Sequence, residues 1–496
     1  MNFIDLWKIP NNLHTTLKDW DGKMVTRFPP EPSGYLHIGH AKAAFINYVI
    51  AKKYHGKMIM RFDDTNPTKE STEYENAIRD DLLKLGIVAD IESHSSDFFD
   101  QILSYADYLI QNNNAYVDDS PQELIAEGRE KCIDSPNRSN SIAKNLEMWN
   151  GMKSGTKRDS CVRIKIDMKH KNAACRDPTI FRFMDEMHHN TGDKYKVYPT
   201  YDFACPIVDS LEGVTHVFRA NEFADRDEQY EFIVDALEIR KPLLFSYGKV
   251  NFEGSVMGKR KIKELINNNV IAGWDDPRLL TIRGLFNRGM HVDALRQFVA
   301  TLGFSKNTNN MTEDKLWITN KKLIDKIATR YSCVPKDNHK EFIIHKIKDN
   351  YEQFCDTKDI LRFVKNQDLG KRPLQYSDRI LISNDECNNF KDNEEITLMN
   401  WGNAFVNGNT LTLNLAGDFK TTEKKVPWIS NSDNVIIQID SYSGLYNPCI
   451  KTYFIGESSL ININRGDYIQ LMKMNYYMCV DIDKINKFIH LIELSC

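Results

Sequence analysis

The sequence contains no pair of cysteines spaced Cys-x-x-Cys, although it has 10 cysteines in all. This absence argues against zinc knuckles and redox dithiols, and it favours free thiols in a reducing compartment. No apolar run reaches the roughly 18 residues that a membrane-spanning helix needs. The first residues, MNFIDLWKIPNN, have neither a basic region nor a long apolar core, so we expect no secretory signal. We therefore expect a cytoplasmic protein that does not bind membranes.

The chain also lacks an excess of positive charge, since its formal net charge is −4 at pH 7 and its pI is near 6.4. Binding to nucleic acid would therefore depend on local basic patches rather than on the overall charge. Three basic pairs are candidates, and each could equally be a solvated surface run: Lys321-Lys322, Lys371-Arg372 and Lys424-Lys425. The length of 496 residues is sufficient for about three or four domains.

Two β-rich runs lie near the start of the chain, at residues 23–28 and 57–62. The residues between them, 40–54, place apolar side chains on one helical stripe, and we expect Gly56 to end that helix. A second helix follows the second run and is closed by Gly86. This order of strand, helix and strand predicts a βαβ unit in a parallel sheet, with its site at the carboxyl ends of the strands.

The rest of the chain changes character twice. Residues 97–200 mix helical and polar segments, and residues 198–223 again suggest strands followed by site-bearing loops. Residues 259–330 have helical periodicity, whereas from about 335 onward short β-rich runs alternate with polar turns. The second pattern is typical of barrels of short strands. We therefore expect an α/β core of the nucleotide-binding type, interrupted by an insertion and followed by an all-β module.

The stretch PPEPSGYLHIGH, residues 29–40, places two histidines at the expected start of a helix. His37 and His40 are three residues apart, so they share one helix face. At such a helix start, free amides and the helix dipole favour anions. Gly39 lies between the histidines and leaves room for a flat base or a phosphate group. On its own, a His-x-x-His pair is more often a cap or a packed pair than a binding site.

A second motif is the basic run SVMGKRKIK, residues 255–263, which by itself would be a solvated surface. Together the two motifs resemble the signatures of class I aminoacyl-tRNA synthetases. Residues 29–40 are similar to the "HIGH" motif in its glutamyl/glutaminyl form, and residues 256–260 are similar to the "KMSKS" loop. Lys259 aligns with the second lysine of that loop. Gly258 stands where the family usually has serine, which predicts a more mobile loop.

The resemblance runs from about residue 20 to the end, and it is to glutamyl-tRNA synthetases of the eukaryotic/archaeal type. It implies a Rossmann-like catalytic core with further domains. The two halves of the catalytic domain would be residues 1–96, with the HIGH motif, and residues 201–258, leading into the lysine loop. Residues 97–200 would form an inserted domain that binds the acceptor stem of tRNA. Residues 259–334 would form a helical stem-contact subdomain, and residues 335–496 a double β-barrel that binds the anticodon.

The resemblance also implies the reaction. The carboxylate of an amino acid attacks the α-phosphorus of ATP, pyrophosphate leaves, and the 2′-OH of the terminal tRNA ribose then attacks the adenylate. The carboxylate is already a nucleophile, so the site must supply alignment and positive charge rather than a general base. Two imidazoles at a helix start and one mobile lysine would supply both.

The family's roles transfer to matching positions of this sequence. The implied catalytic residues are His37, His40 and Lys259. The implied ATP-binding residues are His37, Gly39, His40, Val256, Met257, Gly258, Lys259 and Arg260. Mg²⁺ would accompany ATP, and we expect no metal held by the protein and no zinc.

Four further residues bear on the choice of amino acid: Arg27, Asp63, Tyr201 and Arg219. In the subgroup, residues that match the first three contact the amino acid, and the equivalent of Asp63 binds its α-ammonium group. Glutaminyl enzymes carry a small residue at the position of Arg219, whereas eukaryotic-type glutamyl enzymes carry arginine. A substrate with two carboxylates needs two cations, and the two arginines would provide them. Without the family context, Arg27 and Asp63 could form a structural ion pair, and Tyr201 could be a core aromatic.

The resemblance therefore implies a monomeric glutamate–tRNA ligase that uses ATP, L-glutamate and tRNA(Glu). As in its relatives, activation of glutamate would require bound tRNA. Three alternatives stay open: a glutaminyl-tRNA synthetase, an enzyme that charges both tRNA(Glu) and tRNA(Gln) with glutamate, and an RNA-binding relative with a decayed catalytic site. Arg219 argues against the first. The intact histidines and Lys259 argue against the last.

Overall fold

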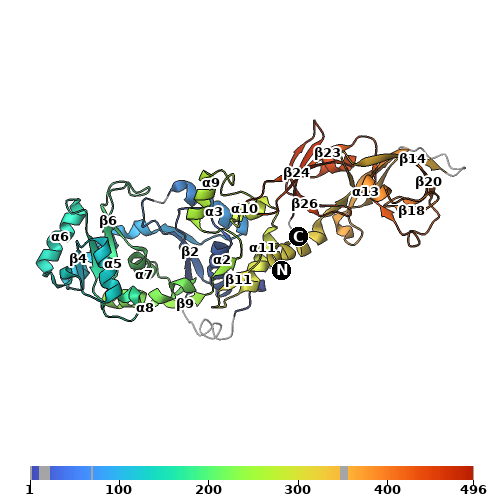
Figure 1. The fold of residues 1–496 in the computed structure, drawn as a ribbon. Helices are drawn as coiled ribbons and strands as arrows, with labels where there is room; N and C mark the ends of the chain where they lie inside the picture. The colour runs from blue at the N-terminus through green and yellow to red at the C-terminus, as the bar shows by residue number, and fades with distance from the viewer. Residues whose placement is uncertain (1–2, 10–22, 69–70, 347–355, 495–496) are drawn as a thin grey trace. The chain divides into compact units, whose positions relative to one another are not determined.

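The computed structural model describes residues 3–9, 23–68, 71–346 and 356–494 (Figure 1). The chain forms two compact units. One comprises Met1–Lys263 and Val299–Thr312, and the other comprises Glu264–Phe298 and Glu313–Cys496. The finer division into five parts remains a prediction.

The first unit contains two groups of parallel strands that adjoin. The strands are β1 (Val25–Phe28), β2 (Lys57–Phe62), β3 (Ile91–His94), β8 (His216–Ala220) and β9 (Leu243–Tyr247). β1, β2 and β3 pair in that order, and β8 pairs with β9. The Thr215 amide donates to Val25 O at 2.9 Å, which places β8 next to β1. The strand order therefore proceeds from β1 to β3 on one side and from β8 to β9 on the other. The place where the order changes direction, between β1 and β8, is a switch point, and α/β proteins bind ligands at such points.

The two helices expected after β1 and β2 are present. Helix α2 spans Ile38–Lys53, and helix α3 spans Thr72–Leu85. Ser71 caps the start of α3 through its side chain, and Gly86 ends the helix with a φ of 73°. A left-handed conformation of this kind favours glycine, because any Cβ atom is crowded there.

The expectation for Gly56 is wrong, because this glycine does not end α2. The residue with left-handed backbone after α2 is His55, with a φ of 53°. Gly56 is required for a different reason: a Cβ atom at this position would lie 2.1 Å from Met24 O. Close approach of two backbone segments, and not a helix stop, therefore fixes glycine here.

The inserted region has its own antiparallel sheet and its own core. The sheet has the order β4 (Ala115–Asp118), β5 (Cys161–Ile164), β6 (Thr179–Phe183) and β7 (Val197–Pro199). Helices α4 (Phe99–Gln111), α5 (Gln122–Lys131) and α6 (Ile142–Ser154) accompany it (Figure 1). Trp149 and Phe181 pack edge to face in its core, with ring centroids 5.2 Å apart. The chain returns to the parallel strands through α7 (Tyr201–Leu211), which contacts α8 (Asp227–Ala236).

Helices dominate the region after residue 259, as the periodicity predicts. They are α9 (Lys259–Asn267), α10 (Ile282–Asn287), α11 (Val292–Leu302) and α12 (Asp314–Ile327). One strand in this region was not expected: β11 (Asn309–Met311) pairs in parallel with β10 (Val250–Phe252). The partners lie far apart in the chain, and such a pairing leaves no local sequence pattern.

The region after residue 328 consists mainly of strands, which agrees with the all-β expectation. One seven-stranded sheet has the order β12 (Thr329–Tyr331), β25 (Tyr468–Leu471), β26 (Tyr476–Asp483), β27 (Phe488–Glu493), β23 (Val435–Ser441), β24 (Ile450–Gly456) and β13 (Cys333–Pro335). The other has the order β21 (Lys425–Val426), β18 (Glu395–Leu398), β19 (Gly402–Asn407), β20 (Thr410–Asn414), β14 (His339–Lys346), β17 (Arg379–Ser383) and β22 (Ile429–Ser430). A hairpin joins β15 (Asp356–Leu361) to β16 (Lys371–Tyr376). Each large sheet has a separate hydrophobic core, as barrel-like modules do.

The three basic pairs differ in the exposure of their side chains. Arg372 is only 2% exposed, and it pairs with Glu457 beneath the ring of Tyr331. Lys424 forms an ion pair with Glu394 at 2.7 Å. Lys321-Lys322, on α12, is exposed and remains a candidate tRNA contact.

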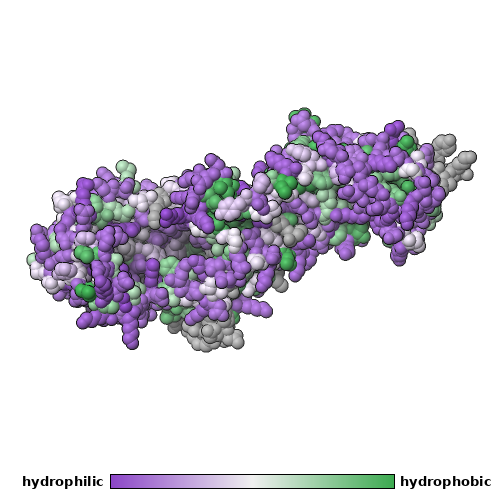
Figure 2. Space-filling model, in the orientation of Figure 1, coloured by the Kyte–Doolittle hydropathy of each residue, from purple (hydrophilic) through white to green (hydrophobic). Residues whose placement is uncertain are grey.

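The surface and the thiols agree with the composition. The face drawn in Figure 2 is mainly hydrophilic, with apolar residues scattered over it. None of the described helices is long and apolar enough to cross a membrane. All eight cysteines within the described residues are free thiols.

Candidate active site

A cavity of about 720 Å³ opens at the switch point between β1 and β8. Most of the predicted site residues line it: Arg27, His37, Gly39, His40, Asp63, Tyr201, Arg219, Met257, Gly258 and Lys259. Two predicted residues, Val256 and Arg260, do not line it, and Arg260 is exposed. The parallel sheet thus gathers residues from both halves of the predicted catalytic domain.

His37 and His40 cap the start of α2 reciprocally. His37 Nδ1 accepts a hydrogen bond from the Gly39 amide at 3.0 Å, and His40 Nδ1 accepts one from the His37 amide at 3.2 Å. The interpretation of the pair as helix caps is therefore correct. It does not compete with a role in binding, because a neutral ring that accepts at Nδ1 carries its proton on Nε2. The hydrogen bonds accepted by both Nδ1 atoms thus place the ring proton of each histidine on Nε2, from which it can be donated to a phosphate oxygen.

Both imidazoles are neutral at pH 7. Burial, together with the positive charge of Lys259, lowers the pKa of His37 to about 4. Burial and the same charge also lower the pKa of His40 well below its ordinary value. The histidines therefore offer hydrogen bonds but not the positive charge that the sequence interpretation assigned to them. Of the three predicted catalytic residues, Lys259 is the one that brings a positive charge.

Lys259 begins α9 and lies against the turn that precedes the histidines. Its ammonium donates to Ser33 Oγ at 2.5 Å and to Glu31 Oε2 at 3.1 Å. The lysine is thus held beside the histidine pair before any ligand binds. A triphosphate in the cavity would compete with the Glu31 carboxylate for this cation.

Gly258, the departure from the family pattern, stands in open space. A Cβ atom there would meet nothing within 4 Å, and its φ lies outside the left-handed range. The serine usual in the family would therefore fit without any rearrangement.

Arg27 is buried in an ion cluster centred on Asp209. Its Nε donates to both carboxylate oxygens of Asp209, at 3.0 and 3.2 Å, and Arg61 Nη2 donates to the same group at 2.5 Å. Tyr230 OH donates to it at 3.0 Å. Burial opposes the ionisation of Asp209, but the two arginines outweigh it and lower the pKa to about 2. Arg27 therefore belongs to a structural ion pair, the alternative to contact with the amino acid in the sequence analysis, but its partner is Asp209 and not Asp63.

Asp63 has no such cation among the described residues. The structure gives its side chain one hydrogen bond, from Thr65 Oγ1 at 3.1 Å. Burial and the neighbouring Asp64 raise the pKa of Asp63 to about 7. A carboxylate that is destabilised in this way favours the arrival of a cation, and the α-ammonium group of an amino acid is one. Tyr201 lies at the start of α7, and burial raises the pKa of its hydroxyl well above the ordinary value.

Arg219 is the second arginine of the cavity, and it is only 6% exposed. Its Nη2 pairs with Asp227, and its guanidinium lies 5.3 Å from the centre of the Tyr230 ring. Its Nε–H has no hydrogen-bond partner among the described residues. Arg27 shares its charge with a fully buried Asp209, whereas Asp227 is 33% exposed. Arg219 therefore keeps more capacity to bind an incoming carboxylate.

Two side chains that organise this site were not singled out from the sequence. Asp209 holds Arg27, and Glu31 holds Lys259. Both lie in stretches that had already been noted, but their partners are 182 and 228 residues away. No spacing rule connects residues at that separation, so only the fold reveals these pairs.

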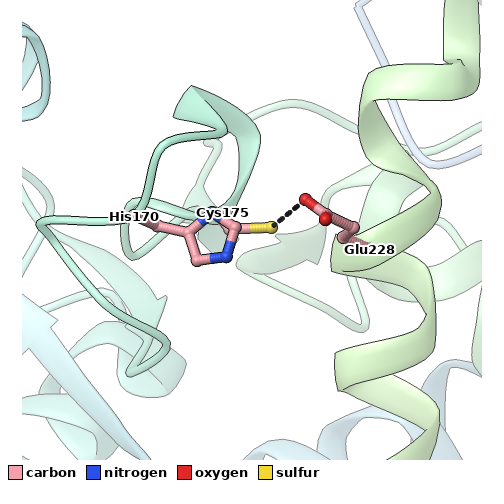
Figure 3. Close-up of side chains that lie close together, drawn as sticks. All are labelled: His170, Cys175 and Glu228. Carbon is pink, nitrogen blue, oxygen red and sulfur yellow. Dashed lines mark hydrogen bonds between the residues drawn. The ribbon is translucent and has the colours of Figure 1, made fainter.

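A candidate metal-binding group lies outside the cavity. His170, Cys175 and Glu228 each bring one donor atom to within 4.8 Å of the others (Figure 3). Asn172 already forms hydrogen bonds to two of these metal-ligating atoms. Its backbone N–H donates to His170 Nδ1 at 3.1 Å, and its side-chain Nδ2 donates to Glu228 Oε2 at 2.8 Å. Burial and Glu228 raise the pKa of the Cys175 thiol, which opposes the thiolate that a metal requires. A hydrogen-bonded junction between the 170–175 segment and α8 explains the group better than a metal centre.

Comparison with known proteins agrees with the site. A model of the catalytic domain of class I tRNA synthetases (E and Q) matches residues 23–326, and a model of their anti-codon binding domain matches residues 328–420. A probable cytoplasmic glutamate–tRNA ligase of Encephalitozoon cuniculi is 42% identical over 481 residues, which are 92% of this chain and 74% of that protein. The corresponding protein of Enterocytozoon bieneusi is 42% identical over 494 residues, 95% of this chain and 77% of that protein. The bifunctional glutamate/proline–tRNA ligase of Mus musculus is 41% identical over 493 residues, 92% of this chain and 32% of that protein.

The chain therefore belongs to the class I tRNA synthetases of the glutamate and glutamine group. Within that group it belongs with the glutamate–tRNA ligases. The resemblance that residues 29–40 and 256–260 suggested is confirmed, and so is the fold class.

Gly258→Ser should leave the fold and the activity nearly unchanged. The new side chain enters open space, so we expect the free energy of unfolding to move by no more than about 0.5 kcal/mol. Denaturant unfolding and the initial rate of aminoacylation test this together. A marked gain in rate would show instead that the glycine keeps the lysine loop too mobile.

Asp63→Asn should stabilise the ligand-free protein at alkaline pH. Since the pKa of Asp63 is raised from 3.8 to about 7, the folded state retains a proton that the unfolded chain releases. The stability of the wild type therefore declines as the pH rises from the lower value to the higher one. We expect the variant to melt at a higher temperature than the wild type at pH 8, with the difference vanishing near pH 4.

Asp159→Asn, which alters an exposed carboxylate, is the control for this experiment and should show no such trend. A variant at Asp63 that is less stable than the wild type at pH 8 would contradict the proposed environment of this carboxyl group.

Proposed function

We propose that the protein activates L-glutamate with ATP to glutamyl-adenylate and transfers the glutamate to the 3′-terminal adenosine of tRNA(Glu). The observation that carries this proposal is the content of one cavity. It combines the two neutral imidazoles and Lys259 on one side with Arg219 and Asp63 on the other. These groups match the phosphates of ATP and the ammonium group and side-chain carboxylate of glutamate.

In the first step the α-carboxylate of glutamate attacks the α-phosphorus of ATP, and pyrophosphate leaves. The Nε2–H groups of His37 and His40 are positioned to donate to phosphate oxygens, and Lys259 would leave Glu31 to neutralise the departing pyrophosphate. Preorganised donors of this kind are each worth about 2.7–4 kcal/mol of transition-state stabilisation. No side chain need act as a general base, because the attacking carboxylate is already ionised.

Glutamate would be selected by charge. Asp63 would receive the α-ammonium group, which restores the ionised carboxylate, and Arg219 would receive the side-chain carboxylate through its unpartnered Nε–H. Arg27, held by Asp209, would line the site with a fixed orientation. A glutamine side chain would offer Arg219 a neutral amide oxygen in place of a second carboxylate beside Asp227. The hydrogen bond to a neutral acceptor is weaker than the charge-assisted one, and this difference would penalise the wrong substrate.

Mg²⁺ would enter with ATP as the counter-ion of its phosphates, since the cavity has no cluster of carboxylates that could hold it alone among the described residues. The hydrogen-bonded state of the His170 group supports a protein without zinc, and metal analysis of the purified protein should find none. We also infer a monomer, for which the mass in solution should be close to 57.5 kDa.

The nearest competing function is glutaminyl-tRNA synthetase, which Arg219 opposes. Aminoacylation of separate tRNA(Glu) and tRNA(Gln) with labelled glutamate or glutamine distinguishes the two. We expect glutamate on tRNA(Glu). Glutamine on tRNA(Gln) would overturn the proposal, and glutamate on both tRNAs would replace it with the broader specificity.

Arg219→Ala should lower kcat/KM for glutamate by at least about 30-fold, because truncating one partner of a buried charge pair costs about 2–5 kcal/mol or more. The KM for ATP should hardly change. Lys241→Ala removes one positive charge from an exposed ion pair and serves as the matched control, with activity near the wild type. If Arg219→Ala still prefers glutamate to glutamine, Arg219 does not select the side chain of the substrate.

A further inference from the structure

Lys42 is a buried lysine of α2 that none of the proposed steps uses. It lies two residues after His40 and lines the same cavity, and it is only 1% exposed. Burying an ammonium group is costly unless the group is paired or hydrogen-bonded. The position of this cation therefore requires an explanation.

The contacts of Lys42 lead to the opposite half of the site. Its Nζ donates to Gly248 O at 2.7 Å and lies 5.5 Å from the centre of the Tyr247 ring. No carboxylate lies within ion-pair distance of this Nζ in the part of the chain that the structure describes. A single backbone carbonyl and an aromatic face thus hold the charge.

The carbonyl that Lys42 binds belongs to a tightly fixed turn. The Gly248 amide donates to Ser305 O at 2.6 Å, and a Cβ atom at Gly248 would lie 1.9 Å from Asn307 O. The turn therefore has little room to move on one side, and Lys42 holds it from the other. Strand β10 follows the turn directly and leads within a few residues to Lys259.

We propose that Lys42 is a positioning residue for ATP. Its charge-assisted hydrogen bond to Gly248 joins α2, which the two histidines cap, to the turn on the opposite wall of the cavity. The bond thereby sets the separation between the histidine pair and the lysine loop. This inference rests on the proposed function in one respect only, which is that the cavity takes ATP.

The charge on Lys42 makes this link sensitive to pH. Burial lowers its pKa to about 8. The other ionisable side chains that line the cavity are Arg27, Glu31, His37, His40, Asp63, Tyr201, Arg219, Glu222, Tyr247, Lys249 and Lys259. Burial is the cause of the shift. As the pH rises through about 8 the ammonium loses a proton, and the remaining neutral hydrogen bond is weaker than the charge-assisted one.

Equilibrium binding of ATP to the full-length protein tests the proposal. We expect Lys42→Met to raise the Kd for ATP by about tenfold, the factor that corresponds to 1.4 kcal/mol. Lys42→Arg, which keeps a charged donor, should restore much of the affinity. Lys53→Met is the matched control, because Lys53 lies on the same helix and also donates to a backbone carbonyl, Trp7 O at 2.7 Å, yet does not line the cavity. Its Kd should stay near the wild type.

The pH dependence separates positioning from a merely structural role. Between pH 7 and 9 the Kd of the wild type should rise, whereas that of Lys42→Arg should stay flat because arginine keeps its charge. Equal Kd values for the wild type and Lys42→Met, or the same pH profile in Lys42→Arg as in the wild type, would overturn the proposal. Lys42→Arg and Lys42→Gln provide the test if Lys42→Met does not fold. A wild type that binds ATP but charges no tRNA would contradict the proposed function and leave this test intact.

Discussion

The ion cluster around Asp209 is the interaction on which the catalytic core depends. One buried carboxylate accepts hydrogen bonds from Arg27 on β1, from Arg61 on β2 and from Tyr230 on α8. It therefore joins the first two parallel strands to helices α7 and α8 of the second half of the core, beside the candidate site. Removing one partner of a buried ion pair typically costs about 3–5 kcal/mol, because the other charge is left uncompensated.

The same cluster decides how charge is distributed in the cavity. Because Asp209 already neutralises Arg27, Arg219 is the arginine better able to bind an anion. Asp63, whose carboxylate is destabilised by burial, is the group better able to bind a cation. On the nucleotide side the histidines are neutral donors, and Lys259 supplies the charge. In the proposed function, each substrate group would thus meet a group of opposite charge or a hydrogen-bond donor, and Lys42 would join the two walls of the cavity.

Local patterns in the sequence were sufficient for much of this description. The βαβ unit followed from alternating β-rich and helical segments, and the all-β region followed from short strands between polar turns. Residues 29–40 and 256–260 identified the family, because their residue types and order are specific to it. Two details failed because local patterns do not show contacts between distant residues. Gly56 is required by a close backbone contact with Met24 and does not end a helix. Arg372 is buried in an ion pair with Glu457, which a run of charges in the sequence does not reveal.

What the sequence could not disclose were pairings over long separations and the protonation that follows from them. Asp209 with Arg27, Glu31 with Lys259, and Lys42 with Gly248 each join segments that only the fold brings together. The neutrality of the histidines and the raised pKa of Asp63 depend on burial, which no spacing rule supplies.

In the proposed site, Arg27 stays bound to Asp209 while Arg219 and Asp63 bind the side-chain carboxylate and the ammonium group of glutamate. A crystal structure with a non-hydrolysable glutamyl-adenylate analogue tests it most directly. The side-chain carboxylate should lie on Arg219 and the ammonium group on Asp63, with the Arg27–Asp209 bond intact; a side-chain carboxylate on Arg27, with that bond broken, would contradict the account.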